Sequence, residues 1–426
     1  MGYVPNIPED QQNMLKSTRK TSIDELFADI PANVKLKKAL SLPAPLSEIE
    51  LLNELKEASE KNAFPSFLGG GCYHHFIPSV VKHILSRSEF YTAYTPYQAE
   101  ASQGILQAIY EYQTMICELT GMDAANASMY DGATALVEAA FLACRVKGRK
   151  EILVSSAVHP EYRRVLNTYA KGADITVKQI PHTKDGLTGE VGRVAGDETA
   201  CLILRQPNFF GCIEEVRGLA EKLHAKGALF IVSADPLSLG ILKAPGDYGA
   251  DIVVGEGQSL GNPQAFGGPG LGIFAAKKEF VRQLPGRIVG KTADAEGKTG
   301  FCLTLQTREQ HIRRERATSN ICSNEALAAL AATVYLSVMG KSGLKKVAEL
   351  CLQKANYLKK KIRDLPSGSL SFPDTPSFKE FVIKTSKSVG LELGLFYPDL
   401  KGHRLICVTE LTKKEEMDKL TEELLS

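Results

Sequence analysis

Short apolar segments alternate with helical segments between residues 134 and 276, and this alternation limits the fold of the 426-residue chain more than any other feature. The apolar segments have the length of strands and lie at residues 151–156, 174–180, 200–205, 228–233, 251–254 and 270–276. The helical segments lie at residues 134–147, 161–171 and 215–226. Near-continuous apolar strands that are separated by helices indicate a mainly parallel sheet covered on both faces. Such α/β sheets bind their ligands beyond the carboxyl ends of the strands.

The regions before and after these alternating segments have a different sequence pattern. Residues 1–62 are polar and carry three short helical segments, so this arm has little to bury alone and is expected to wrap another surface, in this chain or in a partner. After residue 324, long helical segments precede the strands 380–384 and 404–409 and a last helix. We predict an N-terminal helical arm over 1–62, a large α/β domain over 63–324 and a small C-terminal α+β domain over 325–426.

Composition narrows the class of protein. The formal net charge of +2 gives no field that would favour nucleic acid or an anionic membrane surface as a partner. The nine cysteines are scattered and none are spaced as C-x-x-C, which fits a reducing compartment. The first residues lack the pattern of a signal peptide, and no run approaches 18 apolar residues. We expect a cytoplasmic α/β enzyme.

Two positions near strand ends are candidates for binding an anion or a flat ligand. Asp131-Gly-Ala-Thr134 enters a helix, where free backbone amides attract phosphate, although Asp131 capping the helix explains the same residues. His159 stands between a strand and a helix that begins with Pro160. Its imidazole would stack on a cofactor or transfer protons, or else make a single backbone hydrogen bond in a loop.

Three further segments carry side chains suited to binding. Tyr94, Tyr97 and Gln98 lie in a polar loop before a long helix, where they bind a ligand or pack at a domain joint. His74 and His75 follow three glycines; adjacent histidines in an extended loop point apart and no third ligand is evident, so we expect no metal. The arginines at 308, 313, 314 and 316 are typical of a solvated helix face, with Arg316 the candidate for binding a carboxylate or phosphate.

The glycine-rich turn at residues 255–272 joins two apolar strands. In α/β enzymes that use pyridoxal phosphate, a loop of this kind carries the lysine that holds the cofactor as a Schiff base. The sequence has no lysine between Lys243 and Lys277. It therefore keeps the frame of such a site without the residue that performs its chemistry.

Six ordered segments resemble one family. They are YVPNIPED (3–10), SIDELFADIP (22–31), AYTPYQAEASQGILQ (93–107), YDGATA (130–135), GNPQAFGGPG (261–270) and RRERATSNICSN (313–324). They are similar to the P-protein of the glycine cleavage system, in particular to its subunit 1, the alpha subunit of a two-chain glycine dehydrogenase (decarboxylating). This resemblance implies the type I pyridoxal-phosphate-dependent transferase fold and an α2β2 assembly. With its beta subunit, such a chain decarboxylates glycine and transfers the aminomethyl group to the lipoyl arm of H-protein.

The resemblance also implies where this chain departs from a complete site. Aligning Pro263 and Gly267-Gly-Pro-Gly270 puts Gln258 at the family's lysine, or Ser259 if one gap is allowed, and neither side chain forms an imine. The family's aspartate that pairs with the pyridinium nitrogen falls near Val232, with Asp235 close by. A vestigial cofactor site at Gln258, Ser259, His159 and Thr134 is implied, so pyridoxal phosphate would be bound by the beta subunit and not by this chain.

The chain would then have no catalytic residues of its own. Its expected contributors to the partner's active site are Tyr94, Tyr97, Gln98, His74 and Arg316. Two alternatives stay open: a self-sufficient pyridoxal-phosphate enzyme that uses Lys243 or Lys277, and a non-catalytic assembly scaffold. The sequence does not separate a scaffold from a contributor to the partner's site, because both predict an empty local site.

Overall fold

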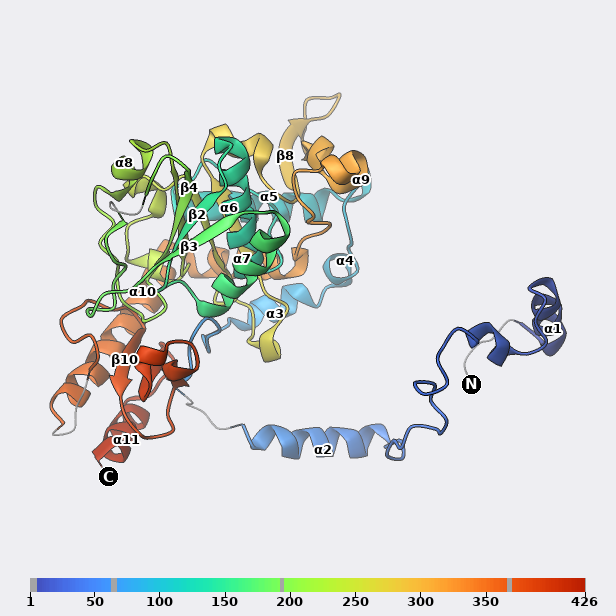
Figure 1. Ribbon diagram of the computed structural model, residues 1–426, viewed down its shortest axis with the longest axis horizontal. Helices are drawn as coiled ribbons and strands as arrows, with labels where there is room; N and C mark the ends of the chain where they lie inside the picture. The colour runs from blue at the N-terminus through green and yellow to red at the C-terminus, as the bar shows by residue number, and fades with distance from the viewer. Residues whose placement is uncertain (1–5, 63–66, 192–194, 366–369, 426) are drawn as a thin grey trace. The chain divides into compact units, whose positions relative to one another are not determined.

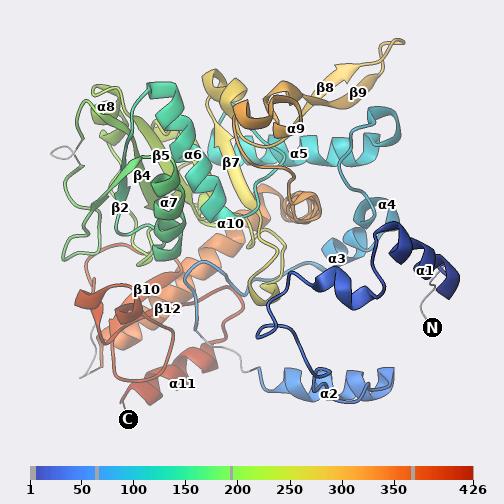
Figure 2. The same ribbon diagram turned by 45° about the vertical axis from the view of Figure 1, so that its right-hand side comes forward.

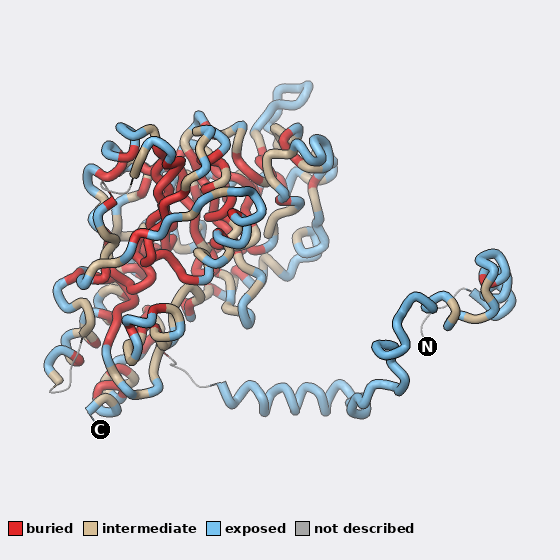
Figure 3. The backbone as a smooth tube through the Cα atoms, viewed as in Figure 1, coloured by how far each residue is buried: buried red, intermediate tan, exposed pale blue. Residues whose placement is uncertain are grey.

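A computed structural model describes residues 6–62, 67–191, 195–365 and 370–425, and the chain divides into two compact units at residues 63 and 64 (Figure 1). The first unit contains the helices α1 (Pro8–Ser17) and α2 (Glu48–Glu60) and the 3-10 helix η1 (Ile23–Phe27). The Ser47 hydroxyl and the Glu50 carboxylate form a capping box that fixes the start of α2. Leu15 is the one buried residue between 6 and 62, and the tube in Figure 3 is correspondingly exposed along this arm.

The second unit is built on a seven-stranded sheet with the order β1-β7-β6-β5-β4-β2-β3. Its strands are β1 (Ala124–Ala125), β2 (Glu151–Ser155), β3 (Thr176–Ile180), β4 (Thr199–Gln206), β5 (Leu229–Ala234), β6 (Ile252–Glu256) and β7 (Gly272–Ala276). The strands from β3 to β6 pair in parallel, and β7 is antiparallel to both β6 and β1. This pairing confirms the predicted mainly parallel sheet. The strands β2, β4, β5 and β6 are buried over nearly their whole length, as their apolar sequences indicated.

Helices cover both faces of this sheet (Figures 1 and 2). They include α5 (Gln103–Thr120), α6 (Gly132–Lys147), α7 (Pro160–Gly172), α8 (Leu219–His224) and α10 (Ala326–Arg363). Successive residues of β4 point to opposite faces of the sheet and so pack in different cores. Leu202 and Leu204 pack in the core that contains α5, α8 and the first half of α10. Ile203 packs in the core that contains α6. Two apolar layers on one sheet are the pattern expected of a doubly wound α/β fold.

Helix α10 links the large sheet to the C-terminal part of the chain. The sequence predicted two helices over this stretch with a break between Met339 and Gly343, and α10 is interrupted there at Gly340, whose φ of 59° and ψ of −176° are not helical and are accessible to glycine. Beyond the kink, Ala355, Leu358 and Ile362 pack with the last helix, α11 (Lys414–Leu425), and with a small antiparallel sheet. That sheet has the order β10-β12-β11, with strands β10 (Glu380–Lys384), β11 (Leu391–Glu392) and β12 (His403–Cys407). By length and composition α10 would also span a membrane, but its first half packs in the core.

Several shorter elements complete the second unit. The strands β8 (Ile288–Ala293) and β9 (Thr299–Thr304) form a hairpin that the sequence did not predict. Only the base of this hairpin is buried, so its sequence lacks the apolar pattern of the core strands. The arginine-rich stretch forms one-turn elements, among them α9 (Gln310–Arg313) and η9 (Arg314–Arg316), and not the continuous helix face expected. The helices α3 (Ser79–Leu85) and α4 (Ser88–Tyr91) precede α5.

Candidate functional site

A pocket of about 370 Å³ lies where the fold class binds its ligands, at the carboxyl end of β6 and the N-termini of α6 and α7. It is bounded by the glycine-rich turn after β6 and by residues 69–76, which we call the 69–76 segment. The lining residues are Gly70, Gly71, Cys72, Asp131, Ala133, His159, Glu161, Tyr162, Val165, Glu256, Gln258, Gln264 and Gly267 to Gly270. Three of them are carboxylates, and no lysine is among the described residues that line this pocket.

The N-terminus of α6, the candidate phosphate cup, is occupied by carboxylates of the chain itself. Asp131 caps the helix, because its Oδ1 accepts a hydrogen bond of 2.7 Å from the Thr134 N–H. The Thr134 hydroxyl also donates to Asp131 Oδ1, at 3.0 Å. The N–H of Gly132, the first residue of α6, donates to Glu256 Oε2 at 3.0 Å. Of the two interpretations of this motif, the structure shows the capping arrangement.

Glu256 is the residue of this site that the sequence analysis missed. It ends β6, and its Oε1 accepts hydrogen bonds from the backbone N–H groups of Gln258, at 3.0 Å, and Leu271, at 2.9 Å. Burial raises the pKa of this carboxyl, and the three N–H donors act in the opposite direction. A carboxylate directly after an apolar strand and inside a glycine-rich turn was the signal in the sequence that could have identified it.

Gln258, one of the two residues that the resemblance aligns with the family's lysine, uses its whole amide on backbone groups. Its Oε1 accepts from the Tyr73 N–H at 2.9 Å, and its Nε2 donates to the carbonyls of Tyr73, at 3.1 Å, and Asn262, at 2.8 Å. The side chain is buried, and it ties the 69–76 segment to the glycine-rich turn. The adjacent Ser259 is also buried, and its hydroxyl has no hydrogen-bond partner among the described residues.

His159 matches the second of its two interpretations, because its ring nitrogens form hydrogen bonds with backbone groups. The imidazole stacks on the Tyr162 ring with a centroid separation of 4.7 Å and an interplanar angle of 24°. Its Nδ1 accepts from the Glu161 N–H at 3.2 Å, which assigns the proton to Nε2, and Nε2 donates to the Gly70 carbonyl. Burial, reinforced by the nearby charge of Arg205, lowers the pKa of His159 to about 3. The ring is therefore neutral at physiological pH and holds the 69–76 segment in place.

A network of buried charges lies beyond the 69–76 segment, toward the small sheet. Glu380 accepts from the Gly70 N–H at 2.6 Å and from the Tyr73 hydroxyl at 2.8 Å. The Lys379 ammonium lies 3.4 Å from the centre of the Tyr73 ring and forms a 2.8 Å ion pair with Asp235. Asp235, which lies close in sequence to Val232, the position that the resemblance gives to the family's aspartate, is thus paired with a lysine of the chain itself.

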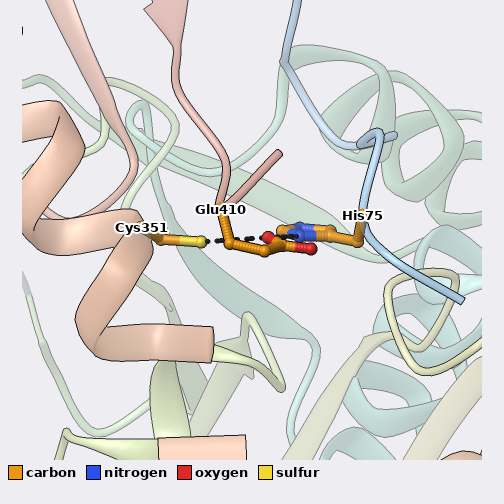
Figure 4. A group of neighbouring side chains, drawn as sticks. All are labelled: His75, Cys351 and Glu410. Carbon is orange, nitrogen blue, oxygen red and sulfur yellow. Dashed lines mark hydrogen bonds and ion pairs between the residues drawn. The ribbon is translucent and has the colours of Figure 1, made fainter. Parts of the chain in front are cut away.

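His75 belongs to a second cluster, together with Cys351 of α10 and Glu410 (Figure 4). The expectation that no third ligand-type side chain accompanies the histidine pair is wrong, because the donor atoms of these three residues lie within 4.8 Å of one another. Cys351 and Glu410 lie 276 and 335 positions further along the chain than His75, so no local motif could have revealed the cluster.

Hydrogen bonds already satisfy this cluster. His75 Nδ1 lies 2.7 Å from Glu410 Oε2, the Cys351 Sγ lies 3.4 Å from the same oxygen, and the Lys379 ammonium donates to His75 Nε2 at 3.2 Å. Burial, together with the charge of Lys379, lowers the pKa of His75, so the imidazole is neutral and donates from Nδ1. Burial alone would raise the pKa of Glu410, but the hydrogen bonds from His75 and the Phe76 N–H hold it at about 2.

The remaining predicted site residues lie on the surface and not in the pocket lining. Tyr94 is 78% exposed and Tyr97 is 54% exposed, and Gln98, His74 and Arg316 are exposed as well. Tyr97 lies beside His311 of α9, with ring centroids 5.9 Å apart, and under the Arg287 guanidinium, 5.7 Å from its ring centre. The structure therefore brings Tyr97 next to the arginine-rich stretch.

The two alternative lysines lie away from the pocket. Lys277 Nζ forms a 2.6 Å ion pair with Asp251 Oδ1, next to the first residue of β6 and hence at the opposite end of that strand from Glu256. Lys243 lines a different pocket, of about 690 Å³, together with Glu118 and Asp247. Neither lysine is among the described residues that line the pocket beside Gln258.

The sheet, its two helical layers and the pocket at the end of β6 define the class as the type I fold of pyridoxal-phosphate-dependent proteins. A C-DES protein with glycine linked to its PLP cofactor shares this fold, with a TM-score of 0.59 at 16% identity, over 82% of this chain and 94% of that one. A crystal structure of glycine decarboxylase (P-protein) of the glycine cleavage system, in inhibitor-bound form, matches with a TM-score of 0.86 at 44% identity, over 100% of this chain and 99% of that one.

Residues 1–424 match the family model of the glycine cleavage system P-protein, and the chain belongs to this family. Relatives named probable glycine dehydrogenase (decarboxylating) subunit 1 cover essentially the whole chain. The relative from Desulforamulus reducens is 52% identical over 100% of this chain and 99% of its own length. The relative from Moorella thermoacetica is 53% identical over 99% of this chain and 98% of its own length.

Proposed function

We propose that this chain is subunit 1 of a two-subunit glycine decarboxylase, in the cytoplasm. With a second subunit it decarboxylates glycine and transfers the aminomethyl group to the lipoyl arm of H-protein. The observation that carries the proposal is the match, along nearly the full length of both chains, to relatives named as subunit 1 of this enzyme. That name implies a partner subunit, and an α2β2 assembly is the arrangement we propose.

In this proposal the partner subunit binds the cofactor, and pyridoxal phosphate would act there as the electron sink for decarboxylation. The residues of this chain do not fit it. Gln258 has no amine, Glu256 and Asp131 bring negative charge to the helix N-terminus that would receive the phosphate, and Asp235 is paired with Lys379. The pocket beside Gln258 therefore supplies no chemical step.

The surface of this chain supports a role in completing the partner's site. Tyr94, Tyr97 and Phe266 are large aromatic residues whose side chains are mostly exposed, and such residues are typical anchors of protein interfaces. We propose that Tyr94, Tyr97 and Gln98, together with His74 and Arg316, reach the partner's active site and help to position glycine or the lipoyl sulfur. A scaffold would leave these side chains without any effect on the reaction.

Tyrosine-to-phenylalanine variants distinguish these two roles. In the complex reconstituted with subunit 2, Tyr94→Phe and Tyr97→Phe are expected to reduce carbon exchange between glycine and bicarbonate by roughly 10- to 100-fold, because one positioning hydrogen bond contributes about 1–3 kcal/mol. Tyr91→Phe, in an equally exposed tyrosine of the same region, is the matched control and keeps the wild-type rate. Size-exclusion chromatography checks assembly. Exchange at the wild-type rate in both assembled variants would show that the loop is structural and that the chain acts as a scaffold.

A further inference from the structure

The N-terminus of α6 is an anion-binding position that the chain fills by itself. A helix of 16 residues presents free N–H groups and a positive dipole end at its start, and both favour an anion there. In this chain the anion is the carboxylate of Glu256, which bridges the Gly132 N–H to the N–H groups of Gln258 and Leu271 in the glycine-rich turn.

The start of α6 is packed closely against the end of β6 and the glycine-rich turn. A methyl group added at Gly132 would lie 2.6 Å from the Tyr162 hydroxyl and 3.0 Å from the Glu256 backbone nitrogen, and one added at Gly270 would lie 3.0 Å from Asp131 Cβ and 3.2 Å from Glu256 Oε2. The helix start, the end of β6 and the turn are therefore packed together around this carboxylate. The Asp131 carboxylate, on the Thr134 N–H, adds a second negative charge to the same helix end.

Gln258 lines the same pocket. Its amide bonds to both the N–H and the carbonyl of Tyr73 and so fixes the 69–76 segment against the turn. His159 holds the same segment through the Gly70 carbonyl. The Glu256 side chain thus takes the place of an anion at the N-terminus of α6, and the Gln258 side chain takes the place of a covalent anchor for a ligand.

We propose that Glu256 and Gln258 are built-in occupants of the cofactor pocket: Glu256 excludes the phosphate of pyridoxal phosphate, and Gln258 removes its attachment point. The pocket is consequently a latent pyridoxal-phosphate site that opens when both residues are changed. This inference deepens the proposed function, since it explains why subunit 1 would leave the cofactor to its partner. It is tested on the full-length chain alone, so its failure is distinguishable from failure of the proposed function.

The test compares cofactor binding by Gln258→Lys with binding by Glu256→Ala/Gln258→Lys. In each variant the new lysine amine can condense with the aldehyde of pyridoxal phosphate and release one water, and borohydride reduction followed by peptide mass mapping locates the product. We expect no adduct at residue 258 in the wild-type chain, weak binding in Gln258→Lys, and at least tenfold tighter binding in the double variant. Absorption titration measures the dissociation constants.

Two controls assign the effect to the phosphate and to Glu256. Pyridoxal lacks the phosphate, so removing Glu256 should not tighten its binding to the Gln258→Lys background. Glu161 lines the same pocket and is exposed, so Glu161→Ala/Gln258→Lys should bind pyridoxal phosphate no better than Gln258→Lys. If Glu256→Ala perturbs folding, as judged by circular dichroism and thermal unfolding, the isosteric Glu256→Gln replaces it.

Either of two results would overturn the inference. One is a folded double variant that binds pyridoxal phosphate no more tightly than Gln258→Lys. The other is a gain of the same size for pyridoxal, which would mean that removing Glu256 only enlarges the pocket. A stable, stoichiometric adduct on another lysine of the wild-type chain would contradict the proposed function instead, because subunit 1 would then hold a cofactor of its own.

Discussion

Individual buried charges in this chain have specific hydrogen-bond partners, and the partners of Glu410 lower the pKa of its carboxyl. Its carboxylate is held by the His75 imidazole and the Phe76 N–H, while the Cys351 thiol lies against the same oxygen that His75 contacts. These groups belong to three distant parts of the chain and join α10, the segment after β12 and the 69–76 segment. The cluster therefore connects the small sheet to the pocket region through hydrogen bonds.

Glu410 is expected to make the stability of the chain sensitive to acid. Its pKa is about 2 in the folded chain, below the ordinary value of 4.5, so its contribution to stability is complete above pH 4.5 and is lost as the pH falls from 4.5 toward 2. Glu410→Gln should lower the free energy of unfolding by roughly 2 kcal/mol at pH 7, where the lost hydrogen-bonded charge counts in full. Urea unfolding at a series of pH values measures the effect.

The difference in the free energy of unfolding between wild type and Glu410→Gln should become smaller as the pH falls. At pH 3 the wild-type carboxylate has lost a large part of its contribution, whereas the amide of Glu410→Gln does not titrate. Glu54→Gln, an exposed carboxylate of α2, serves as the control and should follow the wild-type pH dependence. Wild type and Glu410→Gln with the same loss of stability between pH 5 and pH 3 would show that Glu410 does not carry this pH dependence.

Elements with a strong local pattern were predictable from the sequence, and those held by long-range contacts were not. The core strands β2, β4, β5 and β6 are buried on both faces, so nearly every residue in them is apolar and the pattern is visible without a structure. The β8–β9 hairpin projects away from its buried base and has no such pattern. The break between the two helical stretches of α10 was also visible in the sequence, and it falls at Gly340, whose φ and ψ are not helical.

The same distinction holds for the site. The absence of a lysine at Gln258 is a local property of the turn, and so it was evident from the sequence. The hydrogen bonds that hold the pocket lining together join residues far apart in the chain. They are the bonds of Gln258 to Tyr73, of Glu256 to Gly132 and of Glu380 to Gly70. Spacing along the sequence carries no information about such pairs, and only the fold reveals them.

The glycine-rich turn carries a side chain that packs on nothing in this chain. Phe266 is fully exposed, with a φ of 55°, a conformation that is uncommon outside glycine and costly for a bulky residue. Because it buries nothing here, Phe266→Ala should leave the thermal unfolding temperature of the isolated chain unchanged. If Phe266 anchors the partner subunit, the same change should weaken the complex by roughly 5- to 30-fold, or about 1–2 kcal/mol.

Isothermal titration of subunit 2 into each variant measures this loss. Leu395→Ala is the matched control, since Leu395 is an exposed apolar side chain of the C-terminal part of the chain, and it should bind with wild-type affinity. Equal affinities for wild type and Phe266→Ala would place the interface elsewhere on the molecule.

At the scale of the whole molecule, the chain consists of a folded α/β body and an arm that has almost no core. The body, residues 64–426, contains the apolar layers on both faces of the large sheet. In the arm, by contrast, Ile49, Leu51, Leu52 and Leu55 of α2 are all exposed. A 13-residue helix is marginal in water without tertiary packing, so this helix is expected to gain its stability from a surface that covers its leucines.

Deletion of residues 1–62 tests where that surface belongs. We expect the truncated chain to unfold at the same temperature as the full chain, because Leu15 is the single buried residue in the described part of the arm, residues 6–62. The truncated chain should bind subunit 2 at least tenfold more weakly, because the apolar face of α2 would be buried only in the complex.

Substitutions in the full-length chain refine the deletion. Leu52→Ala/Leu55→Ala should reproduce much of the loss of affinity, whereas Glu54→Gln/Glu57→Gln, on the opposite face of α2, should retain wild-type binding. A lower unfolding temperature for the truncated chain with unchanged affinity for subunit 2 would mean that the leucines of α2 are covered by the chain's own body. Subunit 2 would then contact this chain without the arm, and the interface would lie on the body alone.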